Sequence, residues 1–228
     1  MARFREEPLA IAHGSGSLPG LLIRPPSARW LYVLAHGAGA GMRHAFLVDI
    51  AEALAEREIA TLRWELPYMA AGGKRPDSPA VSHAAVRSAC EAARAHAPEL
   101  RRIAGGKSFG GRMTSQAAAA AALPVDGLAF LGFPLHPPKA PATERADHLA
   151  KVSLPMLFLQ GTRDALAELD LLRPIVSRLG PRARLVEIAG ADHGFDVLVR
   201  SGRTRADVLD ELAGAIAAWL PTVPAPAP

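Results

Sequence analysis

The sequence has few of the features that mark a secreted, disulfide-stabilised or membrane-bound protein. Cys90 is the only cysteine, so the chain cannot form an internal disulfide, and its alanine-rich surroundings favour a small packed residue. No apolar run approaches the ~18 residues of a membrane-spanning helix. The first twenty residues contain Glu6 and Glu7 and no apolar stretch of the length that a secretory signal needs. These absences predict a cytoplasmic protein that does not bind a membrane.

A block of basic residues is also missing. The chain has 26 Lys and Arg against 22 Asp and Glu, a net charge of +4, and its arginines are scattered. Nucleic-acid binding is therefore not expected. Neither an internal repeat nor a linker divides the 228 residues, half of which are hydrophobic. We predict a single domain over residues 1–220, followed by a disordered tail at 221–228, because "PTVPAPAP" offers little to bury.

Short runs rich in Val, Ile and Leu alternate with longer helical patterns along the chain. This alternation predicts an α/β fold, in which a mostly parallel sheet of about eight strands is covered by helices on both faces. The first two strands, joined by "GSGS", are expected to form an antiparallel hairpin at the sheet edge. The predicted strands span residues 9–13, 19–24, 30–35, 59–64, 101–105, 126–131, 154–160 and 183–188. The predicted helices span residues 45–57, 80–96, 109–122, 165–179 and 204–219.

The stretch "GGKSFGGR" at residues 105–112 places a serine among four glycines, between a predicted strand and a predicted helix. The phosphate-binding pattern G-x-x-x-x-G-K-[ST] would need a glycine at position 101, where the chain has Arg101. The pattern G-x-S-x-G matches in full from Gly106 to Gly110. It is typical of a nucleophile elbow, a tight strand-to-helix turn that exposes a serine hydroxyl. On these residues alone, glycines that merely permit close packing of a turn are an equal alternative.

A nucleophilic serine needs a base to take its proton and a third group to orient that base. Asp164 follows the most hydrophobic predicted strand, in "MLFLQGTRDAL", and His193 follows the next strand, in "LVEIAGADHGF". Both therefore lie past the carboxyl ends of parallel strands, at the edge where such sheets bind ligands. Taken separately, Asp164 could cap a helix and His193 could be a surface residue. Their order after Ser108 and their shared edge favour a catalytic triad of Ser108, Asp164 and His193.

Acyl transfer also needs hydrogen-bond donors for the negatively charged oxygen of the transition state. The backbone N–H of Phe109, directly after the serine, is one candidate donor. The second is expected in the glycine-rich loop "HGAGAGMRH" after the third predicted strand, at Ala38 or alternatively at Gly39. These N–H groups would form an oxyanion hole.

Further motifs accompany the elbow, and the full set reads "AHGAGAGMRH", "ELPYMAAG", "GGKSFGGR", "GFPLHPP", "GTRD" and "GADHGF". With them the chain resembles an α/β-hydrolase from about residue 30 to residue 220. It is similar to the dienelactone-hydrolase-like branch, which includes the testis-expressed and histone-acetyltransferase-complex-subunit hydrolase-like proteins. The resemblance implies an α/β-hydrolase fold with a minimal cap or none. Dienelactone hydrolase itself uses a cysteine nucleophile where this chain has Ser108, and some members of the branch serve as scaffolds in nuclear complexes.

These residues predict a serine hydrolase of the carboxylesterase type, in which Ser108 attacks an acyl carbonyl, His193 acts as the base and Asp164 orients His193. The expected partner is a small acyl substrate. No metal or organic cofactor is needed, and the protein is expected to be a monomer or a homodimer. Two alternatives stay open: a binding module that has the fold without turnover, and a thioesterase or peptidase with the same triad.

The substrate site is expected to be open and shallow. The segment from Pro134 to Ser153 is short and contains four prolines, so it cannot form a separate lid domain. Side chains that could line the site lie in loops on the same edge of the sheet, although simple packing is an equal alternative for each. They are Met42, His44, Tyr68, His136 and Phe195.

Overall fold

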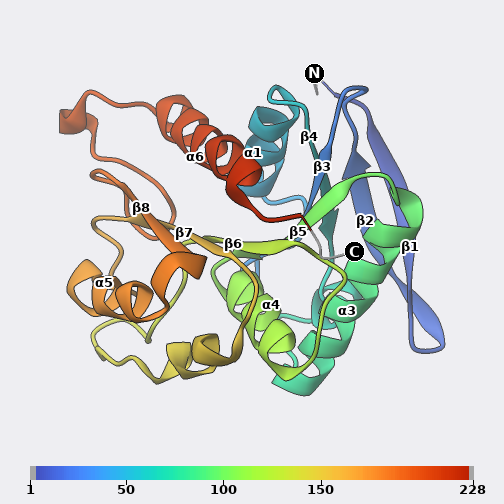
Figure 1. Cartoon of the computed structure of the whole chain (residues 1–228), viewed down its shortest axis with the longest axis horizontal. Coiled ribbons are helices and arrows are strands. Elements are labelled where there is room, and N and C mark those ends of the chain that lie inside the picture. The colour runs from blue at the N-terminus through green and yellow to red at the C-terminus, as the bar shows by residue number, and fades with distance from the viewer. Residues whose placement is uncertain (1–3, 226–228) are drawn as a thin grey trace.

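An eight-stranded sheet forms the centre of the protein, as a computed structural model that describes residues 4–225 shows (Figure 1). The strand order is β1-β2-β4-β3-β5-β6-β7-β8. The pairs β1/β2 and β2/β4 are antiparallel and the remaining neighbours are parallel, so the predicted fold class and edge hairpin are confirmed. The strands are β1 (Glu6–His13), β2 (Gly16–Ile23), β3 (Trp30–Ala35), β4 (Ile59–Trp64), β5 (Arg101–Lys107), β6 (Gly127–Leu131), β7 (Met156–Gly161) and β8 (Ala183–Ile188).

Helices cover both faces of this sheet, α1 and α6 on one face and α3, α4 and α5 on the other (Figure 1). The helices are α1 (Ala45–Ala55), α2 (Pro67–Ala70), α3 (Pro79–His96), α4 (Phe109–Ala120), α5 (Leu169–Arg178) and α6 (Arg205–Trp219). Residues 4–225 also contain four 3₁₀ helices, namely η1 (Glu144–Lys151), η2 (Gly180–Arg182), η3 (Val199–Ser201) and η4 (Leu220–Thr222).

Among residues 4–225 the two largest hydrophobic cores lie on opposite sides of the sheet, because successive side chains of a strand point to opposite faces. In β3, Leu31 and Val33 pack into the core beneath α3 and α4. Tyr32 and Leu34 pack into the core beneath α1 and α6. Both faces of the central strands are thus buried, which explains why their sequences are nearly continuous apolar runs rather than alternating patterns.

Two glycines at the end of β5 permit the close approach of its neighbours on either side. A Cβ atom at Gly105 would lie 1.8 Å from the carbonyl oxygen of Ala129 in β6, and one at Gly106 would lie 2.2 Å from that of Ala35 in β3. Their φ angles are +151° and +144°, which side-chain-bearing residues rarely adopt. The glycines before the elbow therefore have a structural role in the sheet itself.

Several details differ from the sequence-based expectation, and among them β1 begins at Glu6 rather than at 9 and β2 at Gly16 rather than at 19. Helix α2 was not predicted, since its four residues are too short to show a helical period. Helix α5 begins at Leu169 rather than at 165. The tail does not begin at 221, because Val223 is buried and Arg101 donates hydrogen bonds to the carbonyls of Val223 and Pro224. The last part of the predicted tail, 226–228, lies outside the described residues.

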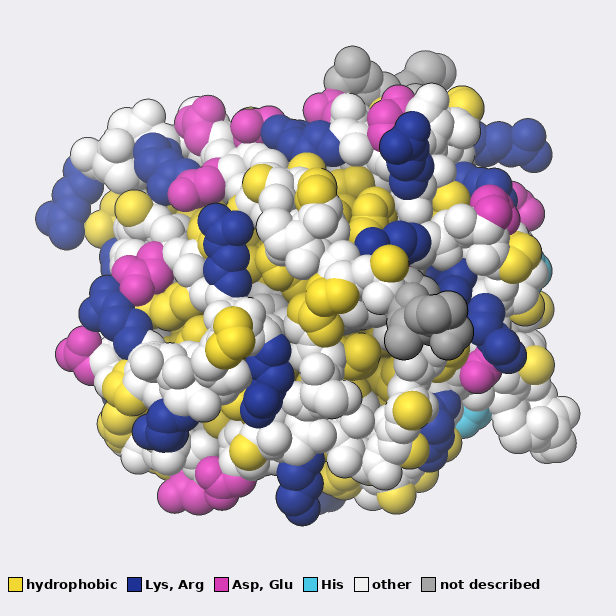
Figure 2. Space-filling view, viewed as in Figure 1, with side chains coloured by type: hydrophobic (Ala, Val, Ile, Leu, Met, Phe, Trp, Pro, Cys, Tyr) yellow, Lys and Arg dark blue, Asp and Glu magenta, His cyan; other side chains and the backbone are white. Residues whose placement is uncertain are grey.

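On the face of the molecule that Figure 2 shows, basic side chains are spread rather than gathered. Hydrophobic surface lies between these Lys and Arg side chains. Within residues 4–225, no helix combines the length and the apolar character that a membrane-spanning helix requires.

Candidate active site

Ser108 stands at the sharp turn between β5 and α4, with a positive φ of 49° and a ψ of −113°. This conformation is costly for a residue with a side chain and persists only when its surroundings hold it in place. The Ser108 N–H donates to the carbonyl of Leu131 in β6. Its own carbonyl accepts from the N–H of Arg112 in the first turn of α4. Sheet and helix thus fix the serine from both sides, as a nucleophile elbow requires.

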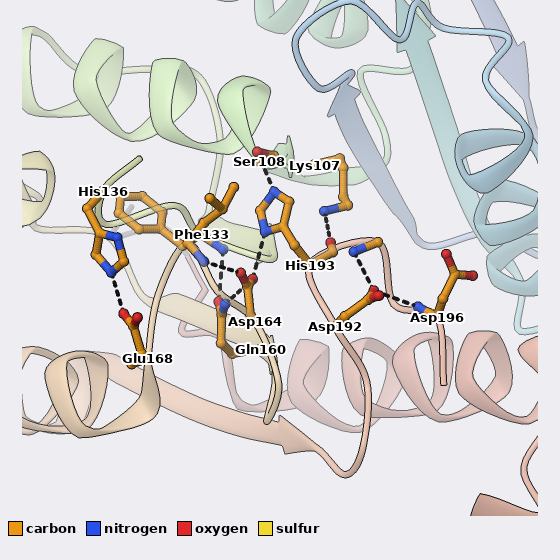
Figure 3. A network of polar contacts seen from close by, with 12 residues as sticks. Lys107, Ser108, Phe133, His136, Gln160, Asp164, Glu168, Asp192, His193 and Asp196 are labelled. Atoms are coloured by element: carbon orange, nitrogen blue, oxygen red, sulfur yellow. Dashed lines mark hydrogen bonds and ion pairs between the residues drawn. The ribbon is translucent and has the colours of Figure 1, made fainter. Parts of the chain in front are cut away.

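The three residues proposed as a triad come together at the carboxyl edge of the sheet (Figure 3). Ser108 Oγ lies 2.8 Å from His193 Nε2, and His193 Nδ1 lies 2.7 Å from Asp164 Oδ2. A carboxylate can only accept at that site, so Nδ1 carries the proton and Nε2 is left to accept the serine proton. The side chain of Asp164 is fully buried, whereas that of His193 is 25% exposed.

Asp164 is held in place by two further donors. Gln160 Nε2 donates to Asp164 Oδ2 over 2.5 Å, and the N–H of Leu166 donates to Oδ1 over 2.8 Å. Gln160 is itself oriented by the N–H of Phe133, which donates to its side-chain oxygen over 2.9 Å. Sequence reasoning missed Gln160, although a polar residue at the end of the apolar run "MLFLQG" was a usable signal.

Asp192 precedes His193 in the sequence, but unlike Asp164 it binds the backbone of its own loop. Its Oδ1 accepts hydrogen bonds from the N–H groups of Gly194, at 2.8 Å, and Asp196, at 3.0 Å. Its own N–H donates to the carbonyl of Asp196. Asp192 thereby closes the tight loop that presents His193, while Asp164 binds the ring.

Two backbone N–H groups beside Ser108 are available for an oxyanion. In the part of the chain that the structure describes, neither the N–H of Phe109 nor that of Ala38 donates a hydrogen bond. The N–H of Gly39 does, to the hydroxyl of Tyr68 over 2.8 Å. Of the two alternatives for the second donor, the geometry therefore favours Ala38 over Gly39.

The loop after β3 that carries Ala38 is anchored by His36, which is fully buried. Its Nδ1 lies 2.7 Å from the carbonyl of Gly37, and its Nε2 accepts from the N–H of Leu66 over 3.0 Å. Met42 also belongs to this anchor, since its N–H donates to Glu65 over 3.0 Å. Burial raises the pKa of Glu65, but the neighbouring His36 side chain and the hydrogen bond from the N–H of Met42 together outweigh burial, so the net shift is downward.

Most of the five side chains predicted to line the substrate site are buried or contact neighbouring protein groups. Met42, Tyr68, His136 and Phe195 are buried, and the exposed His44 caps α1 by accepting the N–H of Phe46. His136 contacts Glu168 through Nε2, and its Nδ1 lies 2.8 Å from the carbonyl of Pro137. Phe195 stacks on Phe46 with ring centroids 5.5 Å apart. These residues shape the loops around Ser108, and contact with a substrate stays a prediction for them.

A metal centre finds no support among residues 4–225, where no three His, Cys, Asp or Glu side chains are grouped so that they could hold an ion. The arrangement at Ser108 instead joins a hydroxyl, a base, an orienting carboxylate and two free N–H donors. Such a set can transfer an acyl group to the serine and then to water.

Comparisons with known proteins agree with this architecture. Residues 28–221 match the family described as "Alpha/beta hydrolase domain". A dienelactone hydrolase from Anabaena variabilis is 21% identical with a TM-score of 0.78, covering 97% of this chain and 99% of that one. A serine hydrolase without a lid from Xanthomonas campestris is 21% identical with a TM-score of 0.75, covering 96% and 97%. An esterase from Pyrococcus furiosus is 14% identical with a TM-score of 0.74, covering 97% and 92%. At these identities, the likeness of the three structures establishes the fold.

Proposed function

The chain belongs to the alpha/beta hydrolase domain family, and from that premise we propose that it is a serine hydrolase that cleaves small acyl esters. The observation that carries the proposal is the continuous hydrogen-bonded line from Ser108 through His193 to Asp164. A protein that only binds a partner has no need of a base 2.8 Å from a serine held at a positive φ.

The reaction would begin with attack of Ser108 Oγ on the acyl carbonyl carbon while His193 Nε2 takes the serine proton. The carbonyl oxygen becomes negatively charged and accepts from the N–H groups of Phe109 and Ala38. Asp164 stays ionised and stabilises the imidazolium. The bond to the leaving alcohol then breaks, and the alcohol oxygen receives the proton from His193. Water, deprotonated by His193, hydrolyses the acyl-serine and restores the hydroxyl.

An open site for a small acyl group is the second part of the proposal. The segment between Pro134 and Ser153 contains η1, whose Ala146 and Leu149 are buried, and η1 packs on α4. Because much of this segment packs on α4, few of its residues are left to form a lid. The similar structures also support an ester substrate, since they include a dienelactone hydrolase, a lidless serine hydrolase and an esterase. Cleavage of a thioester or an amide would use the same catalytic residues. That the chain is related to the testis-expressed branch is also part of the proposal.

Labelling with a fluorophosphonate tests this function, because the reagent forms a covalent bond only with an activated serine. We expect labelling of wild type on the peptide that carries Ser108, none of Ser108→Ala, and strongly reduced labelling of His193→Ala. Ser115→Ala is the matched control. Ser115 Oγ also lies 2.7 Å from a histidine nitrogen, Nε2 of His148, but it lies within α4 rather than at an elbow. Labelling of Ser115, or no labelling of folded wild type, would contradict the proposal.

A further inference from the structure

Two successive residues of the elbow contact two different parts of His193 (Figure 3). Ser108 reaches the ring, through the 2.8 Å contact between Oγ and Nε2. Lys107 is the last residue of β5. Its Nζ donates a hydrogen bond to the backbone carbonyl of His193 rather than to the ring. The nucleophile and its predecessor therefore hold the same residue at its side chain and at its main chain.

The ammonium group of Lys107 lies in a site that is built around it. Its Nζ is 5.2 Å from the ring centroid of Phe195 and 5.9 Å from that of Phe46, and these two rings stack on each other. A Cβ atom at Gly132, at the end of β6, would lie 3.1 Å from Nζ and 3.5 Å from Cε1 of His193. The absence of a side chain at Gly132 thus leaves room for both the lysine and the imidazole.

Charged groups surround this lysine from several elements. Asp164 after β7, and Asp192 and Asp196 after β8, raise its pKa, but desolvation by burial is the larger effect and lowers the pKa to about 8. Arg205, at the start of α6, is a second cation near these rings and lies 6.0 Å from the centroid of Phe46. Among residues 4–225 no carboxylate forms an ion pair with Lys107, so its specific acceptor is the carbonyl of His193.

We propose that Lys107 is a positioning residue that anchors the backbone of His193 and thereby keeps Nε2 aligned with Ser108. The proposal rests on the proposed function and names a further participant in it. The loop that carries His193 is under strain, since Phe195 has a φ of +65°. Without the lysine, the loop would still be closed by Asp192 and held to the segment after β7 by the N–H of Arg163, which donates to the carbonyl of Ala191. The direct bond between the backbone of His193 and the elbow would be lost. A displacement of about 1 Å at a catalytic group can cost ~10²-fold in rate.

Replacement and chemical rescue of the lysine test this proposal. We expect Lys107→Met to lower kcat for a p-nitrophenyl ester ~10–100-fold, with KM within about twofold of wild type. In Lys107→Cys, treatment with 2-bromoethylamine rebuilds an ammonium side chain of nearly the same length and should restore most of kcat. The one native cysteine is spared, because Cys90 is buried and its pKa is raised to about 12. Lys151→Met, which removes an exposed lysine of η1, is the control and should behave as wild type.

A readout that does not depend on turnover separates this inference from the proposed function. The proton on Nδ1 of His193, bonded to Asp164, should give a low-field NMR resonance that disappears in His193→Asn. We expect this resonance to broaden in folded Lys107→Met and to sharpen again in the aminoethylated variant. An unchanged resonance in Lys107→Met would overturn the role of Lys107, whether or not the protein cleaves esters, and so would an unchanged kcat. A sharp wild-type resonance without any ester hydrolysis would overturn the proposed function alone.

Discussion

At the scale of single residues, the roles of the carboxylates around His193 follow from the donors that each already binds. Asp164 accepts from Gln160, Leu166 and the imidazole, and its side chain is fully buried. Asp192 accepts from two N–H groups of its own loop. Only Asp164 can stabilise the imidazolium directly, although Asp192 is the neighbour in sequence.

Replacing each carboxylate by its amide separates these roles. Asp164→Asn should lower kcat by up to ~10⁴, as loss of the orienting aspartate does in serine proteases, because the amide no longer fixes the tautomer of His193. Asp192→Asn should change kcat less than about tenfold, since an amide oxygen can still accept from Gly194 and Asp196. Steady-state kinetics of the two variants decide the matter. Equal losses, or a larger loss for Asp192→Asn, would contradict the assignment of Asp164.

The charge of Lys107 is expected to support activity but to lower the stability of the folded protein. Its pKa in the folded protein, about 8, lies below the ordinary value of 10.5, so between these values the unfolded chain binds more protons. The free energy of unfolding should therefore gain a contribution that rises with pH from about 8 to about 10.5. At pH 7 the buried charge costs stability, and Lys107→Met should be at least as stable as wild type. Urea unfolding at pH 7 and pH 9.5 tests this, and a variant much less stable at pH 7 would show that Lys107 mainly supports the fold.

At the scale of elements, the turn from β5 into α4 depends on close backbone packing on three sides. Gly105 and Gly106 face the neighbouring strands β6 and β3. In the first turn of α4, a Cβ atom at Gly110 would lie 2.5 Å from the carbonyl oxygen of His36. The glycines of "GGKSFGG" are therefore needed for close packing of the sheet. This interpretation is compatible with a nucleophile elbow at Ser108.

A methyl group at the elbow should therefore destabilise the protein. Gly106→Ala places a Cβ atom 2.2 Å from backbone, at a φ that alanine rarely adopts, and should lower the free energy of unfolding by ~2–4 kcal/mol. Gly16→Ala, in β2, is the control, since a Cβ there meets nothing within 4 Å, and it should lie within about 0.5 kcal/mol of wild type. Denaturant unfolding measures both. A stable Gly106→Ala variant would mean that the sheet tolerates a wider spacing at β5.

Sequence patterns predicted most elements because strands β3 to β8 are short apolar runs between clear turn signals. The predicted start of α5 was wrong because a local sequence signal was misleading. Asp164 suggested a helix from 165, but it caps a turn that ends before α5, with its Oδ1 bound to the N–H of Leu166. Lys107 could not be assigned from sequence, because its partner His193 lies in a segment that only the sheet order brings near. Gln160 stands only four residues before Asp164, so the polar residue that ends the run "MLFLQG" was a signal that the sequence analysis passed over.

At the scale of the whole molecule, the parallel strands gather four distant segments at one edge of the sheet. The loop after β3 supplies Ala38, the elbow after β5 supplies Ser108, and the loops after β7 and β8 supply Asp164 and His193. Carboxyl ends of parallel strands always share an edge, which is why order along the chain was enough to predict this assembly. The interval between β6 and β7, where a lid could lie, packs its η1 turn on α4 instead.

The open site that we propose predicts how the rate depends on substrate length. A long acyl chain would be only partly buried, so each added methylene should gain less than the ~0.8 kcal/mol of full burial. We expect kcat/KM for p-nitrophenyl esters to be highest at acetate or butyrate and to fall by octanoate. Initial rates over an acyl series measure this, with Ser108→Ala as the blank. A steady rise out to dodecanoate would instead require a deep acyl tunnel.

The central claim is that Ser108 becomes acylated during turnover. Mixing the protein with excess p-nitrophenyl acetate in a rapid-quench instrument, followed by mass spectrometry of the intact chain and of its peptides, observes this step directly. The account predicts a burst of p-nitrophenol of about one equivalent or less and, at the same time, one acetyl group on Ser108 that decays as turnover ends. Asp164→Asn should slow both phases. Hydrolysis without any acetyl group on Ser108, or acetylation that persists at another residue, would contradict the account.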